Sequence, residues 1–565
     1  MKNYFIIFLI AMTAGHNVDG QVKQDAGQVF YQQNYRPGDW ITFSGNRFVT
    51  SIAVSHNKAY IGTEGGVLRY DYVKKQWEYP LTTSNGMLDN VVYRVGYDQR
   101  TDYVWIATKS GLQFYNPYSQ QFTAATYAQI GIDPNETILS IGFDQSNAWL
   151  QTAKTFYTTN GTILNVTRGT PPQNGIRWFG NASQLIDRLP NIFTNSESGY
   201  QFYSSELNFV DREFRKFPLS CYAFDPFGNI WIGSYGAGAW FANSVSNLAE
   251  PLKYGLAMED VTAMAFDNAA MWFGGYAQPL IQNSLFNEYS AITEWNQETD
   301  QFTYYESGFQ RGLKADKVTA LLIDSHNVWI GTEEGLIRKS KSMDYWSTFG
   351  AYSGLFHPHI YALAKQDNRL FIGSEEGLNF ASIVDKDYVI QRVDIPELRN
   401  LAVFKILISD NVLWLGTDNG IYAIDQNEKR WYHYDAYGFS AGATTYLRQY
   451  VRGIAEDDSA IYFASQKNIV RYGKKSKQWE SIPLNPDFIE SGINDAACDD
   501  RNLWIATNSG ILRFVKNKRK WIYYSSQDGL AADIVKSILI DGDYVWFGTE
   551  KGVTQFYWNA LHLKE

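Results

Sequence analysis

Short apolar runs alternate with turns rich in Asp, Asn and Gly along almost the whole chain. The segment Asp533–Trp558 shows the order most clearly. An apolar run at 534–540 is followed by Asp541-Gly542-Asp543, a second run at Tyr544–Gly548 and a third at Val553–Tyr557. Asp and Gly tolerate the backbone dihedrals of tight hairpins, and apolar runs of this length are typical of strands. The pattern therefore predicts successive antiparallel strands.

One anchor recurs through the chain: an aromatic residue, an apolar residue, Gly or Ala, Thr or Ser, two variable residues, Gly and an aliphatic residue. It reads WIGTEEGL at Trp329–Leu336 and WLGTDNGI at Trp414–Ile421. An aromatic run that often follows, as at 520–524, supplies a fourth strand. The residues after the anchor aromatics are Ile61, Ile106, Leu150, Ile232, Phe273, Ile330, Ile372, Leu415, Phe463, Ile505 and Phe547.

Most of these positions lie 41 to 48 residues apart, but 82 residues separate Leu150 from Ile232. The long gap predicts a degenerate twelfth copy, with Trp178-Phe179-Gly180 as its remnant. A four-stranded period of about 40–45 residues is that of a propeller blade. We therefore expect an all-β fold of tandem β-propellers with about twelve four-stranded blades, and two rings because one ring usually holds about 4–8 blades.

An even division predicts a first propeller over residues 21–300, with an irregular or decayed blade at 151–215, and a second over 301–565. This boundary is provisional, because Ala291–Asn296 and Gln301–Tyr305 resemble one hairpin. The alternative is an interleaved arrangement, in which both termini share one propeller and the other is inserted into it.

The last repeat lacks its fourth strand, whereas the N-terminal region begins with an unpartnered one at Asp39–Phe43. Pairing of the two would close a ring and remove exposed sheet edges. We therefore predict that residues 39–43 are essential for stability, so a chain that starts after Phe43 should melt at a lower temperature.

The N-terminus has the composition of a secretory signal peptide at residues 1–20: Lys2, the apolar run Tyr4–Ala14, and small or polar residues up to Gly20. No later run reaches the ~20 apolar residues of a membrane span. We expect a secreted or periplasmic protein, and association with the cell surface is compatible with either location. The net charge of −10 disfavours nucleic acid as a partner. Cys221 and Cys498 lie in separate strand-like segments, which favours two buried thiols over a disulfide.

The anchors WIGTEEGL and WLGTDNGI, together with GLAADIVKSI at Gly529–Ile538, resemble the two-component-regulator propeller repeat. The resemblance implies the periplasmic sensor regions of hybrid histidine kinases, which commonly hold two seven-bladed rings and respond to glycans. The chain is also similar to propeller components of bacterial secretion machinery, although no sorting domain follows the last repeat. Since no kinase or receiver sequence follows it either, we expect no phosphotransfer by this chain itself.

Acidic residues recur in the turns between second and third strands, on what propeller geometry makes one face. Such carboxylates can attract a cation such as Ca²⁺ or bind sugar hydroxyls, while solvated turns are the alternative. These candidates are Glu64, Glu333, Glu334, Glu375, Glu376, Asp418 and Glu550. His357 and His359 are a candidate metal pair, with surface or packing roles as the alternative.

A second acidic series recurs at the turn between first and second strands. We interpret it as structural, because a functional site is expected to break the symmetry of the repeats. Its members are Asp98, Asp144, Asp225, Asp267, Asp324, Asp410 and Asp541.

These features predict a non-enzymatic extracytoplasmic binding or sensing protein that recognises a carbohydrate or a protein on a propeller face. A structural component of an envelope or secretion complex is the alternative, and a polysaccharide hydrolase or lyase a third reading. No cofactor is evident, and no phosphate loop or nucleophile elbow occurs.

Overall fold

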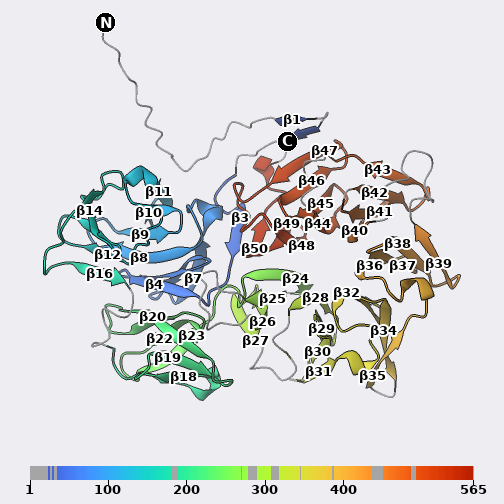
Figure 1. The fold of residues 1–565 in the computed structure, drawn as a ribbon, viewed down its shortest axis with the longest axis horizontal. Coiled ribbons are helices and arrows are strands. Elements are labelled where there is room, and N and C mark those ends of the chain that lie inside the picture. Colours follow the sequence, from blue (N-terminus) through green and yellow to red (C-terminus); the bar gives the residue numbers. More distant parts are fainter. Residues whose placement is uncertain are drawn as a thin grey trace, which may run out of the picture.

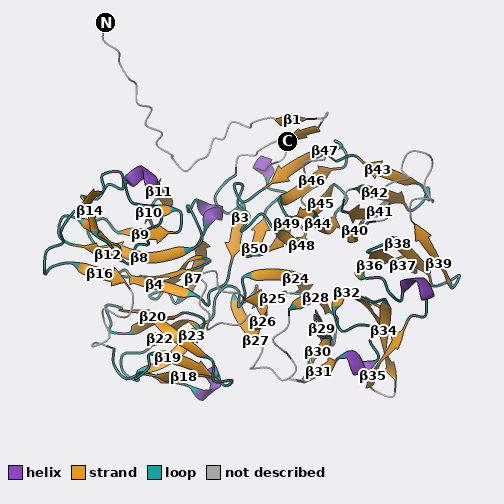
Figure 2. Cartoon of the chain, viewed as in Figure 1, coloured by secondary structure: helices purple, strands orange, loops and turns teal. Residues whose placement is uncertain are grey.

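The computed structural model describes residues 23–25, 28–30, 35–180, 189–268, 270–277, 289–306, 313, 317–343, 345–384, 387–434, 449–466, 468–484 and 492–563. The predicted signal peptide at 1–20 lies outside these residues. Strands dominate the chain (Figure 2), and the helices among the described residues are short 3₁₀ turns. These turns are η1 (Thr83–Asn85), η2 (Ala128–Ile130), η5 (Ser196–Ser198), η6 (Ala351–Ser353), η7 (Pro396–Leu398) and η8 (Leu561–Leu563). No helix in the described ranges is long and apolar enough to span a membrane.

The larger of two propellers consists of seven four-stranded antiparallel sheets, whose inner strands contact one another in order and return from β48 to β24. The inner strands are β24 (Asp260–Asp267), β28 (Val318–Ile323), β32 (Ile360–Gln366), β36 (Val403–Ser409), β40 (Val451–Glu456), β44 (Ile493–Cys498) and β48 (Val535–Asp541). The second strands are β25 (Ala270–Ala277), β29 (Asn327–Thr332), β33 (Arg369–Ser374), β37 (Val412–Thr417), β41 (Ala460–Ser465), β45 (Asn502–Thr507) and β49 (Tyr544–Thr549).

The third and fourth strands complete each of these seven sheets. The third strands are β26 (Tyr289–Asn296), β30 (Leu336–Ser340), β34 (Leu378–Val384), β38 (Gly420–Asp425), β42 (Ile469–Gly473), β46 (Gly510–Val515) and β50 (Gly552–Phe556). The fourth are β27 (Gln301–Glu306), β31 (Trp346–Phe349), β35 (Asp387–Arg392), β39 (Arg430–Tyr434), β43 (Trp479–Ile482), β47 (Lys520–Tyr524) and β3 (Trp40–Phe43).

The ring closes as predicted, because β3 pairs antiparallel with β50 and joins Trp40 to Phe556 and Phe43 to Val553. In Figure 1 the blue β3 lies beside the red β50. Trp40 is buried and stacks on Phe556 with ring centroids 3.9 Å apart. An N-terminal strand thus completes the last sheet, in which β50 is paired on both sides.

The smaller propeller lies between β3 and β24 in the sequence and consists of four sheets. Two of them have four strands: β4 (Val49–Val54), β5 (Lys58–Thr63), β6 (Gly66–Asp71) and β7 (Gln76–Leu81), and then β8 (Val92–Asp98), β9 (Tyr103–Thr108), β10 (Gly111–Asn116) and β11 (Gln121–Thr126). The third has β12 (Ser140–Phe143), β13 (Ala148–Gln151), β14 (Phe156–Thr159), β15 (Thr167–Arg168) and β16 (Arg177–Gly180).

The fourth sheet has β17 (Phe193–Thr194), β18 (Tyr200–Tyr203), β19 (Asn208–Asp211), β20 (Lys216–Phe224), β21 (Ile230–Ser234), β22 (Gly238–Ala242) and β23 (Leu248–Leu252). Inner strand β4 contacts both β8 and β20. A small hairpin, β1 (Lys23–Asp25) with β2 (Gln28–Phe30), precedes the rings.

The eleven anchor aromatics occupy the second strands of these eleven sheets, and all are buried. The segment that we expected as the remnant of a twelfth blade instead forms β16, which pairs with β12 inside the third sheet. A boundary at residue 300 would cut the hairpin β26–β27 and the sheet that runs from Asp260 to Glu306. The sheet of β24 to β27 therefore includes residues on both sides of position 300, and β3 and β50 belong to one sheet although more than 500 positions separate them.

Two segments connect the rings and lie side by side. Gly45, between β3 and β4, forms a parallel bridge with Leu256, between β23 and β24. The Asn46 N–H donates to the Leu256 carbonyl at 3.2 Å, and the Leu256 N–H donates to the Ser44 carbonyl at 3.1 Å. The smaller propeller is therefore attached through a paired double connection.

The recurring turn Asp has the expected structural role at several blades. Asp324 accepts the backbone N–H groups of His326 and Asn327, and its other oxygen accepts the indole N–H of the anchor Trp329 at 3.1 Å. Asp144 and Asp225 make the equivalent bonds to their own turns and anchor indoles. These carboxylates tie each tight turn to the buried aromatic of the same sheet.

Both cysteines are free thiols. Cys221 is buried in β20, as predicted, whereas Cys498 at the end of β44 is only half-buried. Burial raises the pKa of each thiol to about 12, which keeps both protonated at neutral pH.

Candidate ligand-binding site

Each inner strand of the larger propeller has a β-bulge directly after its first β-branched residue. A bulge turns the extra residue out of the regular pleat and re-aims its side chain. The bulged residues stand at one end of the ring, beside the turns that join second and third strands. They are Thr262, Thr319, Tyr361, Phe404, Arg452, Asn494 and Lys536.

Most of the polar bulge residues have a structural task. The Thr319 hydroxyl donates to the carbonyl of Ile360 at 2.5 Å, and the Asn494 amide donates to the carbonyl of Val535 at 2.8 Å. Each acceptor is the first residue of the next blade's bulge. These side chains therefore link neighbouring blades, and the repeat explains them.

Three consecutive blades break this symmetry. Tyr361 and Phe404 replace the polar residue by half-buried aromatic rings, which meet edge to face at 5.1 Å, and Arg452 places its guanidinium 5.0 Å from the Phe404 ring centroid. His359 extends the group on one side, 4.4 Å from Tyr361, and Tyr450 on the other, 5.7 Å from Phe404. We call these five residues the aromatic cluster.

The predicted histidine pair joins one of the predicted carboxylates here. Glu375 lies 3.3 Å from Nδ1 of His359 and 3.7 Å from Nδ1 of His357. The Glu375 N–H also donates to the His359 carbonyl. Within the described ranges, no three His, Cys, Asp or Glu side chains are grouped to hold a metal ion. The two imidazoles thus face the half-exposed carboxylate of Glu375, and the metal site stays a prediction.

Two further predicted carboxylates act on the same cluster. Burial raises the pKa of Tyr361, the negative charges of Glu375, Glu333 and Asp418 raise it further, and Arg452 opposes them. Burial also raises the pKa of Asp418. One buried oxygen of Asp418 has no hydrogen-bond partner among the described residues, which is costly unless a ligand or water satisfies it.

The remaining predicted acids do not join this group. Glu64 is buried in the smaller propeller, where its carboxylate accepts the Tyr235 hydroxyl, so it has a structural partner. Glu550 lies in the turn between β49 and β50, in the sheet that β3 completes. Glu334 and Glu376 are exposed beside Glu333 and Glu375, in the same turns.

The fold is similar to those of several solved structures, whereas no protein-family model and no curated protein matches the sequence. The chain is similar to the extracellular domain of the hybrid two-component system BT4673 from B. thetaiotaomicron, with 13% identity over 97% of this chain and 74% of that one and a TM-score of 0.44. The corresponding domain of BT3049 from the same organism has 15% identity over 95% and 78%, with a TM-score of 0.42.

The chain is also similar to PorZ, a surface component of the type-IX secretion system of Porphyromonas gingivalis. That likeness has 12% identity over 94% of this chain and 76% of PorZ, with a TM-score of 0.47. These proteins belong to the two groups that the repeat resembles.

Sequence reasoning missed Tyr361, Phe404, Arg452 and Tyr450, because single aromatic residues do not stand out in a chain with 16% aromatics. A signal for three of them was present. When the repeats are aligned on their inner strands, the second position is Thr, Asn or Lys in the other blades of the ring and departs only at 361, 404 and 452.

Proposed function

We propose that this chain is a non-enzymatic extracytoplasmic binding protein that recognises a carbohydrate at the aromatic cluster of the larger propeller. The observation that carries the proposal is the break in the repeat. Where other blades use the bulge residue to bind the next blade, three consecutive blades present Tyr361, Phe404 and Arg452 toward solvent.

The chemistry of this group suits a sugar. The rings of Tyr361 and Phe404 offer an apolar surface to the C–H face of a pyranose ring. Because the sugar would bind through this face, its hydroxyl groups would not all lose their hydration. Glu333, Glu375 and Asp418 provide hydrogen-bond acceptors around them, and Arg452 provides donors. The unpartnered Asp418 oxygen is an acceptor that a sugar hydroxyl would satisfy.

A screen of the full chain against neutral oligosaccharides, followed by calorimetry, tests the proposal. Saturable binding should weaken about tenfold or more in Tyr361→Ala and in Phe404→Ala, because truncation removes the stacking surface. Tyr432→Ala is the control, since Tyr432 is a more exposed tyrosine on the outer strand β39, outside the aromatic cluster. Equal affinity in Tyr361→Ala and the wild type would refute the site.

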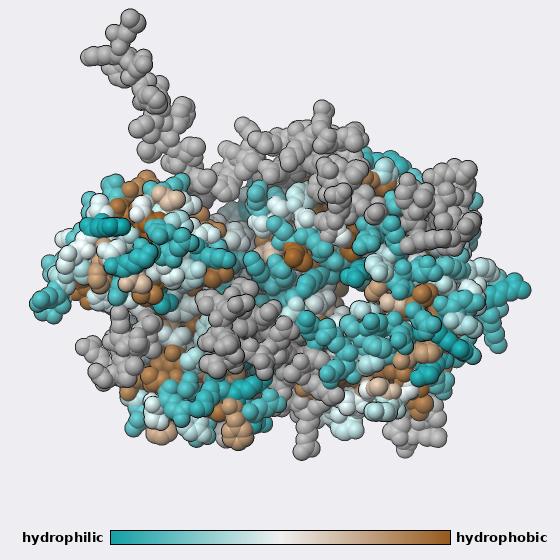
Figure 3. Space-filling view, in the orientation of Figure 1, coloured by the Kyte–Doolittle hydropathy of each residue, from teal (hydrophilic) through white to brown (hydrophobic). Residues whose placement is uncertain are grey.

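The same screen separates the alternatives. Absence of any glycan binding, combined with reproducible association with a purified envelope protein, would favour a structural component of an envelope or secretion complex. Large apolar side chains are scattered over the described surface in Figure 3 among hydrophilic residues. Formation of a glycan product, lost in Asp418→Asn, would show that the chain is an enzyme.

A further inference from the structure

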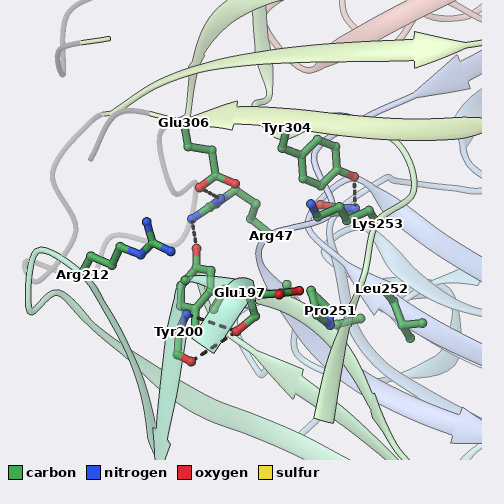
Figure 4. Close-up of a pocket in the computed structure, with 15 residues that line it drawn as sticks. Arg47, Glu197, Tyr200, Arg212, Pro251, Leu252, Lys253, Tyr304 and Glu306 are labelled. Carbon is green, nitrogen blue, oxygen red and sulfur yellow. Dashed lines mark hydrogen bonds and ion pairs between the residues drawn. The ribbon is translucent and has the colours of Figure 1, made fainter. Parts of the chain in front are cut away.

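A cavity of about 230 Å³ lies between the two propellers, away from the aromatic cluster. Its walls come from three parts of the chain: Asn46 and Arg47 of the first connection, Tyr200 and Arg212 of the smaller propeller, and strand β27 of the larger one. Figure 4 shows Arg47 between Glu306 and Tyr200. The cavity therefore exists only because the rings are joined as they are.

The floor of the cavity is a buried ion pair. The side chains of Arg47 and Glu306 are only 5% and 10% exposed, and Nη1 lies 2.5 Å from Oε2. Nη2 of Arg47 also lies 3.3 Å from the Tyr200 hydroxyl. A buried pair with further hydrogen bonds holds its groups in fixed positions, so this floor is preorganised.

A second tyrosine forms the wall beside it. The Tyr304 hydroxyl accepts the Asn46 amide at 2.8 Å and donates to the Gly255 carbonyl at 3.1 Å. Burial raises the pKa of both Tyr200 and Tyr304, so both stay protonated at neutral pH. The cavity thus has two neutral aromatic side chains with fixed hydroxyls.

The mouth of the cavity has charges of a different kind. Arg212, Lys253 and Glu197 are exposed, and none of the three has an ion-pair partner among the described residues. Lys253 lies 5.8 Å from the Tyr304 ring centroid. In a chain of net charge −10, two free cations beside one carboxylate make a local positive site.

We propose that this cavity is a second binding site, for an acidic monosaccharide or the acidic end of a glycan. A carboxylate on the ligand matches Arg212 and Lys253, and sugar hydroxyls match the Glu197 carboxylate and the tyrosine hydroxyls. The cavity is smaller than the roughly 300–1,000 Å³ of pockets for drug-sized ligands, which suits a single sugar residue. The proposal does not depend on binding at the aromatic cluster.

Calorimetric titration of the full chain with D-glucuronate tests this site, with D-glucose as the ligand that lacks the carboxylate. We expect saturable glucuronate binding that is about tenfold or more tighter than glucose binding. Arg212→Gln should weaken glucuronate about tenfold and leave the melting temperature unchanged, because Arg212 is exposed. Arg430→Gln is the matched control, an exposed arginine on β39 of the larger propeller.

Each other outcome has a definite meaning. Equal binding of glucose, no saturable glucuronate binding, or unchanged affinity in Arg212→Gln would overturn the proposal. Binding of L-glutamate without glucuronate would assign the cavity to a zwitterion instead and would overturn it as well. Tyr361→Ala should bind glucuronate normally, and loss of binding in that variant would place the acidic sugar at the aromatic cluster.

Discussion

Replacing Trp40 by Ala tests how the larger ring is held closed. Trp40 is 3% exposed, stacks on Phe556 at 3.9 Å, and meets Tyr524 edge to face at 5.8 Å. Gly529 packs so closely against it, at φ +131°, that an added Cβ would lie 2.6 Å from the indole. The indole is therefore enclosed on several sides by the last two sheets.

The expected loss follows from this burial. Truncating a fully buried Trp to Ala costs about 3–5 kcal/mol through lost transfer free energy and the cavity left behind. For a unit of this size, a shift of about 2 °C per kcal/mol corresponds to a fall in melting temperature of about 6–10 °C. Calorimetry of the full chain would show whether the melting transition of the larger propeller shifts.

Trp431→Ala is the matched control, since this tryptophan lies on the outer strand β39 and is 38% exposed. We expect its substitution to lower the melting temperature by no more than about 2 °C. A Trp40→Ala variant that melts within about 1 °C of the wild type would refute closure by β3 as a stabilising contact.

Three further predictions concern buried groups. Burial raises the pKa of Asp324, but hydrogen bonds from Lys365, the turn amides and the Trp329 indole outweigh burial and hold this pKa at about 2, so the carboxylate stabilises the fold above pH ~4. In urea titrations at pH 7, the free energy of unfolding of Asp324→Asn should be about 1–2 kcal/mol below that of the wild type. This difference should become smaller as the pH falls toward 2, and a difference that does not change with pH would contradict the prediction. Lys405 binds Asp495 at 2.6 Å across the inner strands. Lys405→Met should destabilise the ring by about 1–3 kcal/mol. If the ion pair is the cause, the same substitution should have a much smaller effect in a chain that already contains Asp495→Asn, and an equal effect in both chains would contradict this. Because Cys221 is buried and its thiol stays protonated at neutral pH, a thiol reagent should label Cys221 only after unfolding in a Cys498→Ser chain, where it is the one remaining thiol; rapid labelling of that folded chain would contradict this burial.

The sequence alone determined the blade. The anchor, the Asp turn and the alternation of apolar runs each depend on residues within one repeat, where near neighbours set the backbone and the burial. The closing strand was also predictable, because the last repeat lacks a fourth strand and the strand at residues 39–43 has no partner in its own repeat, so the two can pair. The acidic turns could be found because they recur at the same position of several repeats, and the histidine pair because its two members are two residues apart in the sequence.

Only the tertiary structure decided where the rings divide, which bulge residues meet and where a cavity forms. Residue 300 is near the middle of the repeats, yet it falls inside the sheet of β24 to β27. The larger ring takes β3 from one end of the repeats and β50 from the other, so its residues do not form one continuous half of the sequence. Tyr361, Phe404 and Arg452 come together because a ring brings equivalent positions of successive blades to one face. Arg47 meets Glu306 only through the packing of two rings, a long-range contact that no repeat encodes.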